Sequence, residues 1–372
     1  MGLDVRPIRK LVRRSAAGRY VLIVLLCLAT SVSLTRFFLE LSDYPQLGND
    51  ELHIAHVLWG GLLLMSGALL PLLFANRGIL DSSAVLNGVG MGLFLDEVGK
   101  FITQANDYFF PAAAPIVYAF FLLTLWIYML VRSQRKDNAR VILYDVLSVL
   151  SEYLDKDLSA QERDWIVARL QTARKLDSAG EYHAFLDTME QFVHSEQVPI
   201  VLHHDDFFTR QLNKFRCYEN QKLPQPKFRR FVLAALLMWG LVAILYPFLS
   251  LNFSSRHVQI SGLFSELINT NLILSESGVT LLIRLIGEIA IGFSIMLSAI
   301  FFAVGKEKTA LNLAQSSLLV SISGLYLLVF YYDQFSAIVF VILQFIVLGL
   351  VSRYKMKFIE HQERQNNPNL FR

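Results

Sequence analysis

Runs of about twenty apolar residues constrain this chain more than any other feature of its sequence. A helix needs about twenty such residues to cross the hydrocarbon core of a bilayer, and soluble helices rarely lack a polar face over that length. Charged residues make up 17% of the 372 positions, against about 25% in soluble chains. We therefore predict an all-α polytopic membrane helix bundle with eight spans, near residues 20–39, 53–75, 84–104, 112–132, 231–250, 277–303, 309–331 and 334–352.

The lysines and arginines between these runs predict the direction of each span, because they accumulate in short cytoplasmic connections. The N-terminus, the turn at Arg77, the connection with Lys306 and Lys308, and the stretch after residue 352 are basic. They alternate with connections that hold one base or none. The chain is thus predicted to lie in the cytoplasmic (inner) membrane of a bacterium, with both termini cytoplasmic. A basic start before an apolar run also fits a signal peptide, but no clear cleavage site follows the run.

A polar stretch divides the spans into two sets of four. We predict a membrane domain at 1–132, a cytosolic helical insert at 133–230, a second membrane domain at 231–352 and a cytosolic tail at 353–372. Four helices are expected in the insert. The first has an apolar face at helical spacing, and the next two follow capping boxes. The fourth is expected near 207–218. The face comprises Leu143, Val146, Leu147, Leu150 and Leu154, and the capping boxes are Ser159-x-x-Glu162 and Ser178-x-x-Glu181.

Ionisable side chains in the second and third predicted spans form the candidate site. Charged groups at membrane depth are costly and by default mark a functional site. His53 and His56 lie one turn apart near the outer end of the second span. Asp96, Glu97 and Lys100 lie in the outer half of the third. The five side chains can meet at one depth if the two spans pack together.

The third span also carries a glycine pattern that favours close packing. Gly88, Gly92, Asp96 and Lys100 follow one another at intervals of four, and small residues at this spacing let another helix approach. An internal ion pair between Asp96 and Lys100 is predicted. Glu97 lies about 100° away on the helix and needs another partner, for which the candidates are His53, His56 and Arg36.

The second set of spans carries a weaker version of the same pattern. Arg284 and Glu288 stand four residues apart in the outer half of the sixth span. They fit an ion pair that joins helices. They also fit a second wall of the same polar cavity, and the sequence leaves both readings open.

A divalent metal is the one cofactor that the residues suggest. His53, His56 and Glu97 have suitable ligand chemistry, although their spacing is not a specific zinc signature and interfacial histidines need no metal. His203 to Asp206 also combine ligand types, but consecutive residues on a helix do not share a face, and Asp205 fits an N-cap. No phosphate-binding loop or hydrolase motif is present in the sequence. The net charge of +3 gives no indication of a nucleic-acid partner.

Three motifs between Leu52 and Phe110 carry a family resemblance. They are His53-x-x-His56, then Gly90-Met-Gly-Leu-Phe-Leu-Asp-Glu-Val-Gly-Lys-Phe101, then Asn106-Asp-Tyr-Phe-Phe110. In these motifs the chain resembles a group of uncharacterised bacterial multi-spanning membrane proteins. The resemblance covers about a sixth of the chain, implies a membrane protein in which this stretch matters, and implies no activity.

Three functional hypotheses follow from these observations. The first is a polar pocket in the outer half of the bilayer that binds an ion or small ligand for transport or sensing, with the histidines responding to protons. The second is a metal-dependent membrane-embedded enzyme acting on a lipid-like substrate. The third is a membrane scaffold whose insert at 133–230 binds a cytosolic protein. The lipid bilayer is a partner in all three, and the sequence leaves the substrate and the oligomeric state open.

Overall fold

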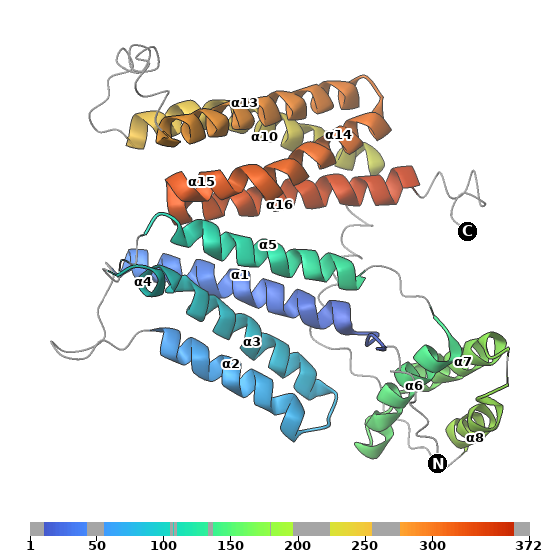
Figure 1. The fold of residues 1–372 in the computed structure, drawn as a ribbon. Helices are drawn as coiled ribbons and strands as arrows, with labels where there is room; N and C mark the ends of the chain where they lie inside the picture. The colour runs from blue at the N-terminus through green and yellow to red at the C-terminus, as the bar shows by residue number, and fades with distance from the viewer. Residues whose placement is uncertain are drawn as a thin grey trace, which may run out of the picture. The chain divides into compact units, whose positions relative to one another are not determined.

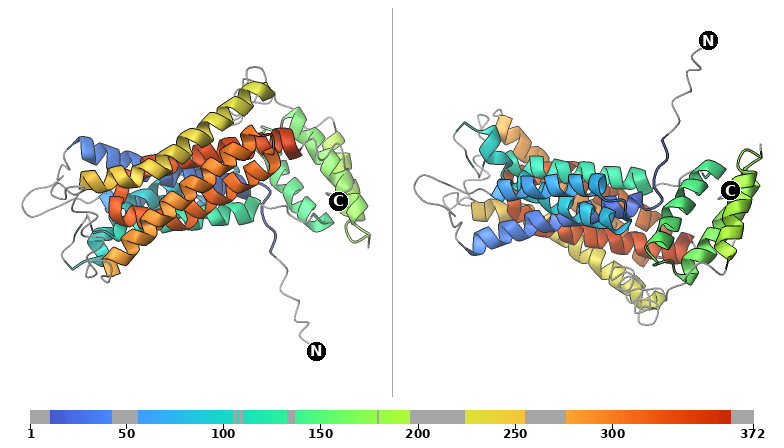
Figure 2. Two further views of the ribbon diagram at one scale, coloured as in Figure 1. Left: turned by 90° about the horizontal axis from the view of Figure 1, so that it is seen from above. Right: turned by 90° about the horizontal axis from the view of Figure 1, so that it is seen from below.

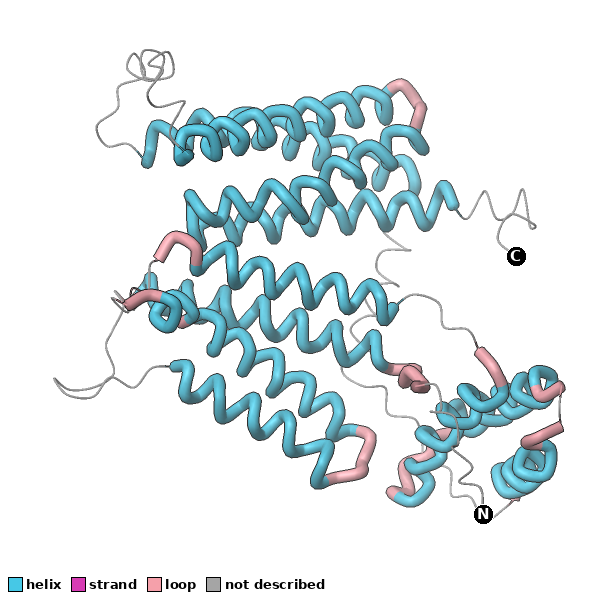
Figure 3. Tube along the Cα trace, viewed as in Figure 1, coloured by secondary structure: helices cyan, strands magenta, loops and turns pink. Residues whose placement is uncertain are grey.

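The computed structural model describes residues 11–42, 56–104, 107, 110–132, 137–178, 180–195, 224–254 and 276–360. The elements assigned in these ranges are all helices (Figures 1 and 3). Eight helices are long and apolar enough to cross a membrane. The prediction of an all-α polytopic bundle with eight spans is therefore confirmed.

The first four spans are α1 (Ala17–Leu41), α2 (His56–Leu73), α3 (Gly78–Asp96) and α5 (Ala113–Arg132). A short helix, α4 (Val98–Ile102), follows α3. We predicted one helix from 84 to 104, and this is wrong at both ends. The backbone of Glu97, with φ −92° and ψ 9°, leaves the helical region and separates α3 from α4.

The insert contains α6 (Ala139–Leu154), α7 (Ala160–Leu176) and α8 (His183–His194). The last four spans comprise α10 (Gln225–Ser254), α13 (Glu276–Ala303), the interrupted seventh span and the last span. The seventh span joins α14 (Glu307–Val320), the π-helix η1 (Ser321–Leu325) and α15 (Tyr326–Asp333). A 3₁₀ turn, η2 (Gln334–Ser336), leads to α16 (Ala337–Tyr354), and the π-helix η3 (Lys355–Glu360) follows.

The chain forms two compact units. Unit 1 comprises Met1–Tyr108 and Phe120–Phe207, and unit 2 comprises Phe109–Ala119 and Phe208–Arg372. Most of α5 and all of α6 to α8 therefore belong to unit 1. Within unit 1, α3 packs against both α1 and α2 (Figures 1 and 2).

Glycines set how closely these three helices approach. A Cβ added at Gly88 would lie 2.6 Å from Cβ of Cys27, and one at Gly92 would lie 2.6 Å from Cβ of Ser31. The predicted small-residue pattern thus packs α3 against α1. On the other side, a Cβ at Gly60 of α2 would lie 2.8 Å from the α3 backbone. The narrow spacing brings polar side chains of all three helices within reach of one another.

The insert has a small apolar core of its own, formed by residues of α6, α7 and α8 that include Ile142, Leu158, Ile166, Leu170 and Leu186. The predicted face of α6 is partly wrong. Leu143 and Val146 are buried, but Leu147 and Leu154 are 45% and 79% exposed. The buried face of α6 instead includes Ala139, Ile142 and Val149.

One of the two predicted capping boxes is confirmed. The Ser159 hydroxyl accepts the N–H of Glu162, whose carboxylate accepts the N–H of Ser159. The second is wrong, because the carboxylate of Asp177 accepts the N–H groups of Glu181 and Tyr182 and α8 begins only at His183. The fourth predicted helix, near 207–218, and the His203–Asp206 stretch lie outside the described residues.

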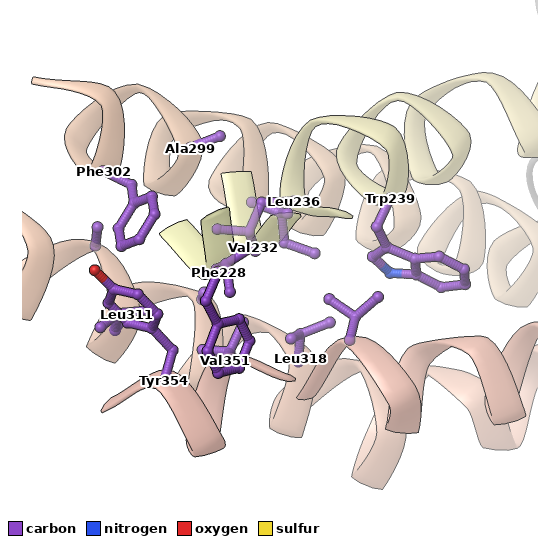
Figure 4. Packing of buried hydrophobic residues seen from close by; sticks show 14 residues of the cluster. Phe228, Val232, Leu236, Trp239, Ala299, Phe302, Leu311, Leu318, Val351 and Tyr354 are labelled. Carbon is purple, nitrogen blue, oxygen red and sulfur yellow. The ribbon is translucent and has the colours of Figure 1, made fainter. Parts of the chain in front are cut away.

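The core of unit 2 is formed by α10, α13, α14 and α16 (Figure 4). The ring of Tyr354 packs edge-on against Phe228 and Phe302, with centroids 5.6 and 5.4 Å apart. Its hydroxyl lies 3.0 Å from Oε2 of Glu307. Phe302 belongs to α13, the span that also carries Arg284 and Glu288.

Candidate functional site

A buried group of ion pairs connects α1, α2 and the break between α3 and α4. Asp96 and Glu97 are 0% and 1% exposed. The Arg36 guanidinium donates from Nε to Oδ1 of Asp96 and from Nη2 to the main-chain oxygen of Asp96, the latter at 2.9 Å. A cation at the C-terminus of α3 also interacts favourably with the helix dipole. Arg36 therefore both pairs with the buried acid and stabilises the end of α3.

His56 bridges the two acids. Its Nε2 lies 3.0 Å from Oδ2 of Asp96, and its Nδ1 lies 3.1 Å from Oε1 of Glu97. A protonated imidazole can donate to both carboxylates, whereas a neutral ring has only one N–H to donate. The arrangement is therefore sensitive to one proton. It also confirms His56 as a partner of Glu97.

Lys100, which lies in α4, also belongs to this group of ion pairs. Its Nζ donates to Oε1 of Glu97 at 3.1 Å. Asp96 contacts Arg36 and His56, and its predicted pairing with Lys100 stays a prediction. The prediction assumed a continuous helix, and the break at Glu97 removes the interval-of-four relation on which it rested. We name these five residues, Arg36, His56, Asp96, Glu97 and Lys100, the unit 1 cluster.

One atom of the unit 1 cluster is left without a partner. Oε2 of Glu97 is buried and accepts no hydrogen bond from any residue in the described ranges. A buried unsatisfied carboxylate oxygen is costly. It gives the cluster a site at which a proton, a water molecule or a small cation could bind.

The metal prediction remains a prediction. His53, one of its three ligands, lies outside the described residues. Among the residues that the structure describes, no group of three or more His, Cys, Asp or Glu side chains is arranged for a metal ion. Within the cluster, Arg36 and Lys100 already supply positive charge to the two carboxylates.

Arg284 and Glu288 belong to a second cluster, within unit 2. Arg284 donates from Nε to Oε1 of Glu288 at 3.1 Å and from Nη1 to Oδ1 of Asp333 at 2.9 Å. Its Nη2 donates to Oδ2 of Asp333, which also accepts from the Tyr246 hydroxyl at 3.0 Å. We name these four residues the unit 2 cluster. The ion pair within α13 thus extends to α10 and α15.

Sequence reasoning did not assign Asp333 or Tyr246 to a site. Asp333 lies between the predicted seventh and eighth spans, in a connection without Lys or Arg that is predicted to lie outside. Its predicted depth nevertheless matched that of Arg284, and this was the signal that could have paired them. A shared cavity between Arg284, Glu288 and the residues of the second and third spans remains a prediction, because the two groups belong to different units.

A small, mainly apolar cavity of about 30 Å³ lies beside the unit 2 cluster. Three side chains that line it each have a buried polar atom without a hydrogen-bond partner in the described ranges, namely Oε2 of Glu288, Nε1 of Trp239 and Oε1 of Gln344. A volume of this size holds about one or two water molecules. The π-helix residues Ser321 and Leu325 form part of the wall, and π-helical turns are frequent at functional sites.

No protein-family model, curated protein or solved structure matches this chain.

Proposed function

We propose that this integral membrane protein binds and releases a proton at His56, Asp96 and Glu97, and that this step is linked to transport or sensing of an ion or small ligand. The observation that carries the proposal is the imidazole of His56, whose two nitrogens each contact a buried carboxylate. Histidine is the side chain whose ordinary pKa permits a charge change near neutral pH.

The charges of the unit 1 cluster support two states, one with a neutral and one with a protonated His56 ring. With a neutral ring, the two cations Arg36 and Lys100 balance the two carboxylates. With a protonated ring, the cluster carries one additional positive charge in a buried setting. A buried unbalanced charge is costly, so the protonated state favours either an anionic ligand or a rearrangement of the cluster.

The break between α3 and α4 provides an element that can rearrange. Irregular backbone at membrane depth is tolerated where protein buries it or where it lines a cavity, and interrupted helices commonly supply ion and substrate sites. Glu97 stands at this break and contacts both His56 and Lys100. A proton that changes the contacts of Glu97 therefore acts directly on the orientation of α4.

Backbone hydrogen exchange of the full-length protein in detergent tests this proposal. After correction for the intrinsic exchange rate, we expect protection in α4 to differ about tenfold between pH 5.5 and pH 8. This corresponds to ~1.5 kcal/mol for one hydrogen bond to a charged group. His56→Gln is expected to abolish the difference.

His194→Gln is the matched control, since His194 lies at the end of α8 in the insert. An H56Q protein whose α4 responds to pH as the wild type does would contradict the proposal.

A further inference from the structure

A basic cavity of about 510 Å³ lies in unit 1, at the end of the spans predicted to face the cytoplasm. Its wall is formed by the stretch before α1, the first turns of α1, the last turns of α5, and Asp137 and α7 of the insert. Its charged lining consists of Arg13, Arg14, Arg19, Arg132, Arg169 and Asp137. Five cations and one anion thus surround a space in the size range of small-molecule sites.

Contacts between the elements hold this wall in place. Nη1 of Arg13 donates to the main-chain oxygen of Leu130 at 3.2 Å. A Cβ added at Gly18 would lie 3.9 Å from Cα of Arg132, so the first turn of α1 passes close to the end of α5. The cavity is therefore framed by packed helices and not only by long surface side chains.

The insert contributes the guanidinium of Arg169, which neighbouring side chains hold in place. Arg169 of α7 lies 3.0 Å from Asp137 and 3.6 Å from Asp145, and it stacks over the Trp165 ring at 5.7 Å. Its Nε is buried and donates to no acceptor in the described ranges. A guanidinium with an unsatisfied N–H on a concave basic wall is suited to an additional acceptor.

The positive charge of the cavity is only partly balanced by carboxylates. Arg19 pairs with Asp81 at 3.0 Å, and Arg169 pairs with Asp137. Within the described ranges, Arg14 and Arg132 pair with no carboxylate; Arg132 contacts only the Tyr128 hydroxyl, at 3.4 Å, and its ring. The two arginines are thus available to an anion, and the hydroxyls of Ser15 and Tyr128 also line the space.

We propose that this cavity binds a phosphate group, carried either by an anionic phospholipid headgroup or by a soluble phosphate ester. Guanidinium groups match phosphate oxygens with paired donors, and basic pockets between membrane helices on the cytoplasmic side bind anionic headgroups. Leu22 and Val131 also line the cavity, which places apolar side chains beside the arginines as a lipid requires. The site uses no residue of the unit 1 cluster, so it stands or fails independently of the proposed function.

Binding to the purified full-length protein tests the proposal. One arm titrates phosphatidylglycerol into protein held in phosphatidylcholine nanodiscs, and a second titrates glycerol 3-phosphate into protein in neutral detergent. Removing both unpaired arginines in R14A/R132A should weaken binding about 30-fold, from roughly fivefold for each basic residue. R140A/R163A removes two arginines from the insert outside this cavity and should change binding less than about twofold.

Each outcome decides a separate part of the proposal. Saturable binding of phosphatidylglycerol alone identifies a lipid headgroup site, and binding of glycerol 3-phosphate identifies a soluble phosphate site. R14K/R132K should lose affinity, because lysine lacks the planar fork. The proposal is overturned if neither probe binds, if R140A/R163A loses as much affinity as R14A/R132A, or if the lysine variant binds as the wild type does. Unchanged thermal unfolding of each variant excludes misfolding as the cause.

Discussion

Each unit buries an arginine beside two carboxylates inside its spans, but the two arginines are used differently. In unit 2, Arg284 contacts both Glu288 and Asp333, the latter with two nitrogens. In unit 1, Arg36 contacts Asp96 at its side chain and at its main-chain oxygen. One guanidinium thus joins two acids in unit 2, whereas the second acid of unit 1, Glu97, has other partners in His56 and Lys100.

Those other partners give the two clusters different chemistry. In unit 1, Glu97 contacts His56 and Lys100, and histidine is the residue type that ordinarily changes its charge near neutral pH. In unit 2, the groups around the carboxylates are a guanidinium, which stays protonated, and the Tyr246 hydroxyl. The comparison suggests a permanent clamp in unit 2 and a proton-responsive element in unit 1, although both began as similar charge patterns in the sequence.

Removing the clamp is expected to have the largest effect. Arg284→Met leaves Glu288 and Asp333 buried without their shared cation, which typically costs ~3–5 kcal/mol. We expect a strongly lowered thermal unfolding midpoint in detergent and a reduced yield of folded protein. The measurement is the unfolding midpoint followed by circular dichroism.

A triple variant, R284M/E288Q/D333N, separates charge from packing. Because it removes the buried charges together, it should recover much of the stability that R284M loses. An R284M protein as stable as the wild type would contradict the assignment of this cluster as a structural clamp.

Close packing of α1 on α3 is a second feature of unit 1 that can be tested. Gly92→Ala would place a methyl group 2.6 Å from Cβ of Ser31, and such overpacking typically costs ~1–3 kcal/mol. Gly61→Ala is the matched control, because a Cβ there meets nothing within 4 Å. The unfolding midpoints of the two variants should therefore differ, with G92A the lower. Equal midpoints would show that the narrow α1–α3 contact is not required for stability.

The pH-dependent hydrogen exchange of α4 should depend on the unit 1 cluster and not on the unit 2 cluster. One acid variant in each cluster tests this. Glu97→Gln removes the carboxylate that His56 contacts through Nδ1, whereas Glu288→Gln changes the clamp. The wild-type protein is expected to show a difference of about tenfold (~1.5 kcal/mol) in the protection of α4 between pH 5.5 and pH 8. We expect E97Q to remove this difference. E288Q should leave that change as it is in the wild type. A loss of the response in both variants would remove the distinction between the clusters.

The number of spans could be predicted because it depends on chain-local properties. Length and apolar character identify a span without knowledge of its neighbours. Matching positions on successive spans placed His56 among three candidate partners of Glu97, and the structure shows that contact. Capping at Ser159 followed from a local hydrogen-bonding pattern.

The incorrect or missing predictions all concern contacts that depend on helix packing or on backbone geometry. The break at Glu97 has no proline to announce it, so the contact of Lys100 with Glu97 was not predicted. The arrangement of Arg36 with Asp96 depends on the rotation of α1 about its axis. The arrangement of Arg284 with Asp333 depends on how α15 packs on α13. Neither the rotation of α1 nor the packing of α15 on α13 is encoded in the spacing of residues within one helix.

A third group of charges, outside the spans of unit 1, is expected to have the smallest effect. Arg77, in the turn before α3, pairs with Glu152 of the insert and lies 3.9 Å from Glu162. Burial and a hydrogen bond to Glu162 raise the pKa of Glu152 from 4.5 to about 7. Although burial opposes the shift, hydrogen bonds with Glu152 and Ser159 lower the pKa of Glu162. The protonated Glu152 therefore donates to an ionised Glu162.

The sign of the resulting pH dependence follows from proton linkage. Between pH 4.5 and about 7 the folded state binds more protons at Glu152 than the unfolded state, so the free energy of unfolding falls as pH rises across this range and levels off above it. Glu152→Gln keeps a neutral donor at every pH. It should raise the unfolding midpoint by about 2 °C at pH 8 and leave it nearly unchanged at pH 5. Glu181→Gln, at an exposed position of the same insert, should shift neither midpoint. An E152Q protein less stable than the wild type at pH 8 would instead indicate that the ionised Glu152 and Arg77 form the stronger contact between the insert and the spans.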